Sequence, residues 1–254
     1  MKNLVKTFVA MSFCLAVVPV YAQMGGGMGQ PRGPRLDGSM AKLFGKNSAY
    51  TATLEMTTKT PKSITMLGKL AFDAGKSRFE MDMGEAKGGA MPPEAATQMK
   101  AMGMDKMIII GRPDKKIAYM VYPGLNAYAE TSSQDQDAGK IESDYKLEVT
   151  KQGEETVDGH PCVKNKAVVT DNNGGKHESM IWNATDLKEF PVKIETTENG
   201  NTMTMLFKNV KLSKPSASQF EPPTGMKRYD NPMALMQEEM MKRMGGAMGM
   251  PRAR

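Results

Sequence analysis

The sequence predicts a mainly β protein, built on one curved antiparallel sheet with a few short helices. One observation is the alternation of apolar and polar residues in segments such as 192–197 and 202–208, which is the pattern of a strand with one buried face. Another is the turn chemistry between such segments, for example the pair Asn199 and Gly200, which suits a tight hairpin turn. Counting the segments gives about ten to eleven strands of ordinary length, a number that suits a single curved sheet.

The folded domain is expected to begin near Asn47. Apolar residues recur at every second position in 50–57 and again in 64–72, which predicts two strands. Residues 73–76 supply a turn, and the alternation returns in 79–83. Three antiparallel strands in a meander are therefore expected at the start of the domain.

The middle of the domain is predicted to hold one inserted helix and several further strands. A short amphipathic helix is expected to begin at Pro92 and Pro93, because proline is favoured at the first helical position. Residues 131–140 are polar and are expected to form a loop or a weak helix. The further strands are expected at 107–110, 117–122, 127–128 and 145–149.

The stretch from Thr156 to Tyr229 shows the clearest succession of strand and turn signals. A β-rich run ends at residues 171–175, which tolerate positive φ and close a hairpin. Residues 183–191 are too short for a full helix, and Pro191 ends them, so a single helical turn is expected there before the alternating strands 192–197 and 202–208.

The chain is expected to finish with a helix that has methionines on one face. Asn231 and Pro232 suit the N-cap and first positions of a helix, and residues 245–246, both glycine, are expected to end it. Apolar residues recur at roughly helical spacing; they are Met233, Met236, Met240 and Met244.

Residues 1–22 are typical of a secretory signal peptide. Lys2 and Lys6 precede an apolar run that ends in a small-residue cleavage site at Ala22. No segment approaches the roughly 20 apolar residues that a membrane span needs. We therefore expect cleavage near Ala22 and a mature protein without a membrane span, located in the periplasm or secreted. Residues 23–46 are rich in Gly, Met and Pro and are expected to form a flexible leader.

The charge pattern argues against a nucleic-acid-binding protein, and the cysteine count argues against a disulfide-bonded one. The chain has 254 residues, 24% of them charged, and a formal net charge of +6. Because basic and acidic residues are interleaved along the predicted strands, no nucleic-acid partner is expected. Cys14 leaves with the signal peptide and Cys162 then remains alone, so no internal disulfide is expected.

Cys162 and His160 are the pair considered as a reactive or metal-binding site. They lie two residues apart with no second pair elsewhere, and a cysteine nucleophile needs a base within hydrogen-bond reach and a third group that orients it. We interpret Cys162 as a partly buried cysteine in a turn. We therefore predict no catalytic residue, no metal site, no cofactor and no enzymatic activity.

The 26 methionines allow two interpretations. Thioether sulfur is a soft ligand that can hold Cu(I), but methionine is also the flexible filler of apolar and ligand-binding faces. The second interpretation is favoured, because no clustered histidines accompany the methionines. The candidate copper ligands are Met24, Met28, Met99, Met102, Met104, Met240, Met241, Met244 and Met248.

The closing strands carry a resemblance to a known fold. The pattern in residues 182–194, 206–210 and 220–225 resembles the C-terminal half of bacterial exported proteins with the lipoprotein-carrier fold. With the Val-Asp-Gly-His-Pro-Cys turn at 157–162, the chain is more similar to an uncharacterised periplasmic family related to that fold. The resemblance covers about residues 47–230 and implies a half-barrel wrapped around one or more short helices. In the carriers, which have no catalytic residues, the concave face shelters acyl chains.

The candidate site is therefore a hydrophobic-ligand site on the concave face, with a lipid or a lipidated protein as the expected partner. The methionine-faced helices would act as a displaceable lid. Two alternatives remain open: Cu(I) binding by the methionine-rich ends, residues 23–46 and 231–254, and a structural or protein-interaction domain filled with packed side chains. The candidate ligand-binding residues are Leu54, Met66, Leu70, Phe79, Met81, Met203, Met205 and Phe207.

Overall fold

The structure is a computed structural model of the 254-residue chain. It describes residues 43–59, 63–88, 92–132, 146–170, 174–198 and 200–247, except for the side chains of 198 and 244–247. The predicted signal peptide and residues 23–42 of the predicted leader lie outside the described residues, as do most of the predicted loop at 131–140, part of the turn at 171–175, and the candidate copper ligands Met24, Met28 and Met248.

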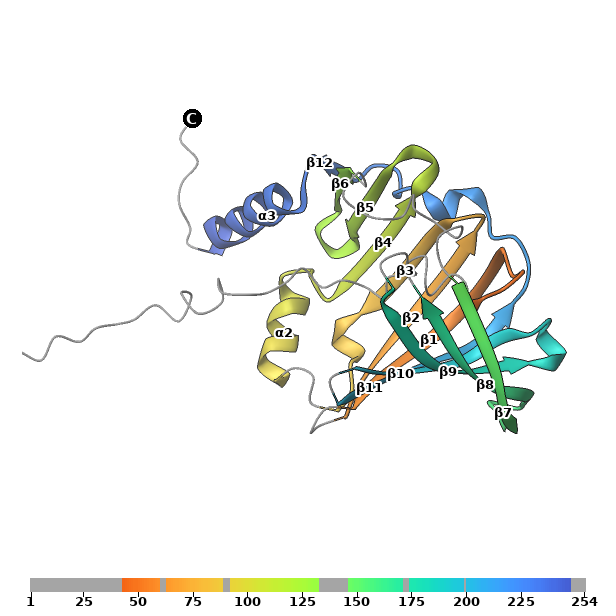
Figure 1. Ribbon diagram of the computed structural model, residues 1–254. Helices are drawn as coiled ribbons and strands as arrows, with labels where there is room; N and C mark the ends of the chain where they lie inside the picture. The colour runs from red at the N-terminus through yellow and green to blue at the C-terminus, as the bar shows by residue number, and fades with distance from the viewer. Residues whose placement is uncertain are drawn as a thin grey trace, which may run out of the picture. The chain divides into compact units, whose positions relative to one another are not determined.

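Strands dominate the described part of the chain (Figure 1). They are β1 (Ala49–Lys59), β2 (Ser63–Asp73), β3 (Lys76–Asp82), β4 (Lys106–Arg112), β5 (Ile117–Tyr122), β6 (Ala127–Ser132), β7 (Lys146–Val157), β8 (His160–Thr170), β9 (Lys176–Ala184), β10 (Phe190–Glu198), β11 (Asn201–Lys211) and β12 (Lys227–Tyr229). The α-helices are α2 (Pro93–Ala101) and α3 (Pro232–Ala247). The 3-10 turns are η2 (Met83–Glu85), η3 (Pro113–Lys115), η4 (Pro123–Leu125), η6 (Thr185–Leu187) and η7 (Ala217–Phe220).

All of these strands join one curved sheet, in the order β12-β6-β5-β4-β3-β2-β1-β11-β10-β9-β8-β7. The pairs are antiparallel except for β12, which runs parallel to β6. The predicted mainly β fold with one curved antiparallel sheet is therefore confirmed. The prediction did not include β12, and it placed the start of β7 but not its length, since β7 runs on to Val157.

The pairing of β1 with β11 joins the early strands to the late ones. Leu54 lies opposite Phe207 and Met56 lies opposite Met205, while on its other side β1 forms a hairpin with β2. Side chains directly opposite each other in an antiparallel pair point to the same face of the sheet. The apolar positions of β1 therefore continue the apolar rows of both neighbouring strands.

Aromatic contacts show which face of the sheet is concave. The ring centroids of Tyr50 on β1 and Phe190 on β10 are 4.9 Å apart, although β11 lies between their strands. Neighbouring strands are about 4.8 Å apart, so the sheet must curl toward these two rings. We call this side the concave face, and it carries the larger of the two hydrophobic clusters.

A smaller cluster lies on the opposite, convex face. Phe220 is fully buried there against residues of β4 and β5, among them Ile110 and Val121. It belongs to the strap, the name used here for residues 216–221. Arg112 donates to the backbone oxygen of Phe220 at 3.2 Å, so the strap is fastened by a charged side chain as well as by apolar packing.

Several local predictions are confirmed. Pro92 is the N-cap residue of α2 and Pro93 is its first residue. The turn predicted before Pro191 is η6. Asn231 caps α3, because its side-chain oxygen accepts a hydrogen bond from the backbone N–H of Ala234 at 2.8 Å.

The folded core begins before Asn47. Leu43 and Phe44, which the sequence placed in the leader, are 6% and 4% exposed, and the Phe44 ring stacks on Tyr50 with centroids 5.2 Å apart. Burial of two large apolar side chains offsets the entropy lost in ordering this segment. Residues 43–46 therefore belong to the packed domain.

The predicted methionine face of α3 is wrong in its orientation. Leu235 is fully buried and sets the inward face of the helix, with Met236 partly buried beside it. Met233 is 79% exposed and Met240 is 41% exposed, because residues 233 and 240 lie on the far side of the helix from Leu235. Only Met236, among the predicted methionines whose side chains are described, packs against the core.

Candidate functional site

The concave face brings all eight predicted ligand-binding residues together. They lie on β3, β2, β1 and β11, which are four consecutive strands of the sheet. The register sets them side by side on one face: Leu70 opposite Phe79, Met81 opposite Gly68, and Met203 opposite Thr58. The period-two alternation predicted the face correctly, because a strand exposes every second side chain on the same side. Whether this face binds a ligand stays a prediction.

Burial divides the eight residues into two groups. Leu54, Met205 and Phe207 are each 1% exposed, and Leu70, Phe79 and Met81 are 6 to 7% exposed. Met66 and Met203 are only partly buried and pack against the edge of the cluster. Of the eight residues, the two partly buried methionines are therefore the most accessible to solvent.

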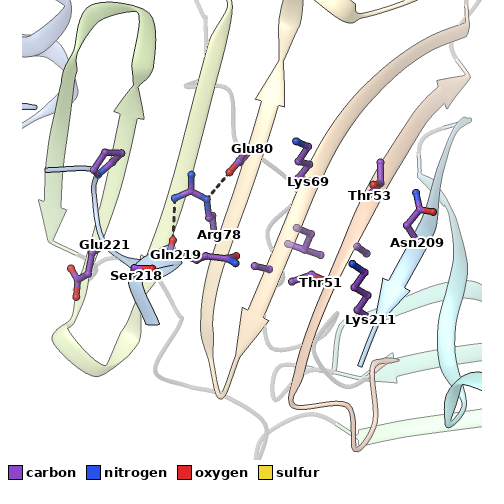
Figure 2. A pocket seen from close by; sticks show the side chains of 14 residues that line it. Thr51, Thr53, Lys69, Arg78, Glu80, Asn209, Lys211, Ser218, Gln219 and Glu221 are labelled. Carbon is purple, nitrogen blue, oxygen red and sulfur yellow. Dashed lines mark hydrogen bonds and ion pairs between the residues drawn. The ribbon is translucent and has the colours of Figure 1, made fainter. Parts of the chain in front are cut away.

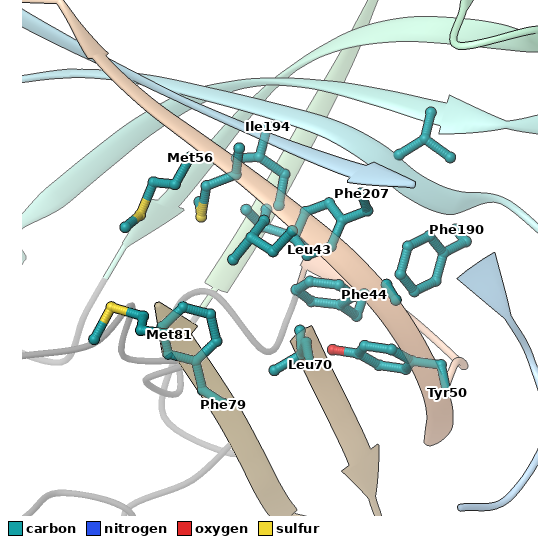
Figure 3. Packing of buried hydrophobic residues seen from close by; sticks show 14 of the residues in the cluster. Leu43, Phe44, Tyr50, Met56, Leu70, Phe79, Met81, Phe190, Ile194 and Phe207 are labelled. Atoms are coloured by element: carbon teal, nitrogen blue, oxygen red, sulfur yellow. The ribbon is translucent and has the colours of Figure 1, made fainter. Parts of the chain in front are cut away.

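One end of the concave face is filled by aromatic rings (Figure 3). Phe44 lies edge-on to Phe190 and Phe207, with centroids 5.4 and 5.5 Å away. Tyr50 lies between Phe44 and Phe72, with its centroid 5.4 Å from that of Phe72. Aromatic packing of this kind is rigid and closes the end of the face.

The other end of the face is rich in methionine. Met56 lies directly between Met66 on β2 and Met205 on β11, and Met81 lies opposite Met107 on β4. Met56 and Met81 are drawn at this end in Figure 3. Because methionine is unbranched and polarisable, such a surface adapts its shape to what it contacts. Met56 and Met107 were missed as site residues, although the alternation places them on the same face.

The residues of β1, β2 and β3 that lie on the concave face are all uncharged. The buried charged side chains among the described residues are Asp73 and Arg112. Both lie on the convex face of the sheet, in the rows of Ala71 and Ile110. Burial raises the pKa of Tyr50 and of Tyr122, so these hydroxyls stay protonated at neutral pH. These rows are thus uncharged and mainly apolar, and their polar groups are hydroxyls, such as those of Tyr50 and Thr58.

The convex face carries a polar hollow of about 610 Å³ between the strap and strands β1, β2 and β11. Figure 2 shows Thr51, Thr53, Lys69 and Lys211 along it. On its strap side, Arg78 donates to Glu80 at 2.7 Å and to the backbone oxygen of Gln219 at 3.0 Å. The hollow is open, and its lining mixes hydroxyl, amide and charged side chains with apolar residues such as Ala71 and Pro223. It could not be predicted from the sequence, because its residues come from distant segments.

Cys162 and His160 do not form a nucleophilic pair. Cys162 is 3% exposed and lies in β8, not in a turn as predicted, where its thiol donates to the backbone oxygen of His160 at 3.3 Å. Burial raises the pKa of this thiol, which disfavours the reactive thiolate. The His160 ring instead pairs with Asp186, Nδ1 to Oδ2, at 2.8 Å. Within the described residues, no group of three or more His, Cys, Asp or Glu side chains is placed to hold a metal ion.

Neither described helix is long and apolar enough to cross a membrane. α3, the longer of the two, has 16 residues.

A family model matches more than half of the chain. It is described as "Domain of unknown function (DUF4412)" and matches residues 50–189. Among curated proteins, none matches this sequence.

Several solved structures are similar to this chain at low identity. An uncharacterised conserved protein from Thermus thermophilus has 11% identity and a TM-score of 0.45, with 76% of this chain and 97% of that chain covered. A LolA superfamily protein from Nitrosomonas europaea has 9% identity and a TM-score of 0.37, covering 71% and 93%. The lipoprotein LppX from Mycobacterium tuberculosis has 9% identity and a TM-score of 0.39, covering 68% and 90%.

Proposed function

We propose, from the premise that this chain belongs to the family described as domain of unknown function DUF4412, that it is a binding protein for a hydrophobic ligand. The ligand is a lipid, or the acyl part of a lipidated protein, held on the concave face of the sheet. The protein performs no enzymatic reaction and acts in the periplasm or outside the cell, after export by the signal peptide at residues 1–22.

The observation that carries this proposal is the contrast between the two faces of the same four strands. On β1, the inward residues Leu54 and Met56 are buried in an uncharged cluster, while the outward residues Thr53 and Glu55 are only partly buried. This apolar surface is closed by aromatic rings at one end and bordered by partly buried methionines at the other. It has the composition of a hydrophobic-ligand site.

The partly buried methionines mark where a ligand would enter. Met66 and Met203 lie on β2 and β11, on either side of β1, and both contact the cluster without being enclosed by it. Flexible thioether side chains can change rotamer to admit an acyl chain at little cost. The aromatic end, where Phe44 and Phe190 pack edge to face, would remain closed.

The first test is native mass spectrometry of the protein purified gently from its own cell envelope, with organic extraction and metal analysis of the same sample. A stoichiometric adduct that extracts as a lipid is expected. Met203→Gln should reduce the occupied fraction about tenfold, because it places an amide on the apolar face. Leu206→Gln is the matched control: Leu206 is also partly buried on β11 but belongs to the opposite row, and its occupancy should equal that of the native protein.

The other outcomes decide between the remaining functions. Bound copper without lipid would favour the methionine-rich ends, where Met240 and Met241 are exposed on α3, and would contradict the lipid proposal. A mass without any adduct, together with no binding of added lipid, would also contradict it and would favour an interaction domain whose interior is packed side chains.

A further inference from the structure

Tyr50 is a buried tyrosine at the start of the concave face. The residue is 1% exposed, and its ring is fixed by three neighbours, with centroids 5.2 Å from Phe44, 5.4 Å from Phe72 and 4.9 Å from Phe190. A ring held on three sides cannot move its hydroxyl to a new partner without repacking the aromatic end. The position of the hydroxyl is therefore set by the fold.

The Tyr50 hydroxyl points inward along the concave face. Figure 3 shows its oxygen directed toward Leu70, away from the backbone of β1. Among the described residues no hydrogen bond reaches this hydroxyl, whereas the hydroxyl of Tyr122, also buried, donates to the Met120 sulfur at 3.2 Å. Tyr229, likewise buried, donates to Glu239 at 2.6 Å. Tyr50 differs from both of these buried tyrosines.

The Tyr50 hydroxyl is not fully enclosed by protein atoms. In the part of the chain that the structure describes, every fully enclosed side-chain nitrogen or oxygen has a hydrogen-bond partner. The Tyr50 oxygen has none there, so it is not fully enclosed, and the small accessible fraction of Tyr50 includes it. A buried hydroxyl without a partner costs free energy, and an acceptor brought to it by a ligand recovers that cost.

The surroundings of the hydroxyl select the kind of acceptor. Burial raises the pKa of Tyr50, so the group is a neutral donor. The residues of β1, β2 and β3 that lie on the same face as Tyr50 are all uncharged, and an ionised carboxylate or phosphate buried without a counter-ion is strongly disfavoured. A carbonyl oxygen carries no net charge and accepts one hydrogen bond from such a donor.

We infer that the Tyr50 hydroxyl is the polar anchor of the concave site and selects apolar ligands that carry a neutral carbonyl, such as an acyl ester or a quinone, over hydrocarbons and ionised fatty acids. The inference rests on the proposed function and adds a specificity-determining residue to it. The apolar rows formed by Leu54, Leu70 and Phe79 would hold the hydrocarbon part of the ligand.

The test compares two probes of similar length that differ in the carbonyl group. Methyl laurate and tetradecane are titrated against the full-length mature protein loaded with the neutral fluorophore N-phenyl-1-naphthylamine, and displacement is followed by fluorescence. The native protein is expected to bind the ester about tenfold more tightly than the alkane. Tyr50→Phe, which removes only the hydroxyl, should lose the preference for the ester and should keep the native affinity for tetradecane.

Thermal unfolding separates an anchor from a structural hydroxyl. Tyr50→Phe should leave the Tm unchanged or raise it, because the lost hydroxyl has no partner in the free protein. Tyr229→Phe is the matched control, since it removes a buried hydroxyl on the edge strand β12 that is bonded to Glu239. It should lower the Tm and preserve the tenfold preference for the ester.

Each other result overturns the inference in a distinguishable way. If tetradecane and methyl laurate displace the fluorophore equally from the native protein, the apolar site stands and the role of Tyr50 is wrong. If Tyr50→Phe keeps the ester preference, or lowers the Tm as Tyr229→Phe does, the hydroxyl is structural. If neither probe displaces the fluorophore, the proposed function itself is contradicted, and the inference with it.

Discussion

Gly68 on β2 illustrates how single residues shape the concave face. It lies between Leu54 on β1 and Met81 on β3 in one row across the sheet. Both of these neighbours carry apolar side chains. A β-carbon at Gly68 would lie 2.6 Å from the Phe79 ring and 2.8 Å from the backbone oxygen of Glu80. Glycine is required here for space, since the missing side chain makes room for the Phe79 ring to lie across the strand.

Gly68→Ala should therefore destabilise the protein by about 1–3 kcal/mol, the usual cost of overpacking a core. Gly153→Ala on β7 is the control, because a β-carbon there would meet nothing within 4 Å. Equilibrium denaturation of both variants measures the free energy of unfolding. Equal stability of the two would mean that Phe79 is free to move, and the face would then be less rigid than its packing implies.

At the scale of elements, the strap is held to the convex face by charged groups around one arginine. Arg112 is 9% exposed and pairs with Asp114 at 2.7 Å and with Glu221, while Lys115 also reaches Glu221 at 2.8 Å. The hydrogen bond from Arg112 lowers the pKa of Asp114 to about 2. Bonds from Lys115 and then Arg112 lower the pKa of Glu221.

Acid should loosen the strap. Because both carboxyl groups have a lower pKa folded than unfolded, they stabilise the fold above their unfolded values of about 4, and this contribution is lost as the pH falls toward 2. The midpoint of urea unfolding, measured between pH 5 and 2, should fall more steeply for the native protein than for Glu221→Gln, which removes the carboxylate of the strap. Glu94→Gln, at an exposed site on α2, should follow the native curve; if Glu221→Gln does too, the carboxyl does not fasten the strap.

The elements differ in how far the sequence could predict them. Strands that alternate with period two, such as β1 and β11, were predicted together with the face they bury, because the pattern is local. β12 was not, since three residues carry no periodic signal and its pairing with β6 depends on the rest of the fold. The packing of Phe44 was missed for the same reason: its partners Tyr50, Phe190 and Phe207 come from three strands.

The candidate site could likewise be predicted only in part. Its apolar rows could be predicted, and all eight residues lie on one face. The Tyr50 hydroxyl could not, because a residue that alternates with apolar neighbours gives no indication of whether its polar atom has a partner. The orientation of α3 could not be predicted either, since methionines and Leu235 are all apolar and tertiary contacts decide which side packs.

At the scale of the whole molecule, a single open sheet has a protected middle and two edges. β1 and β11 are central, whereas β7 and β12 stand at the edges. Val149 on β7 is 50% exposed, and the outer backbone groups of an edge strand have no partner strand within the sheet.

Hydrogen exchange followed by mass spectrometry should therefore show a gradient across the sheet. Peptides from β1, β11 and β10 should exchange slowest, and those from β7 and β12 fastest, because opening free energies are lowest where pairing and burial are least. Sedimentation of the same sample provides the control for self-association. Slow exchange of β7 in a monomeric sample would contradict an uncovered edge.

The pairing of β1 with β11 also sets the order in which the molecule can be made. Thr51 lies opposite Lys211, so the central pair of the sheet cannot form until β11 has been synthesised, long after β1. Until then β1 lacks one of its two neighbouring strands, and Phe207 is missing from the concave face. The early strands therefore remain an unfinished sheet during synthesis, and the concave face becomes complete only when β11 has joined them.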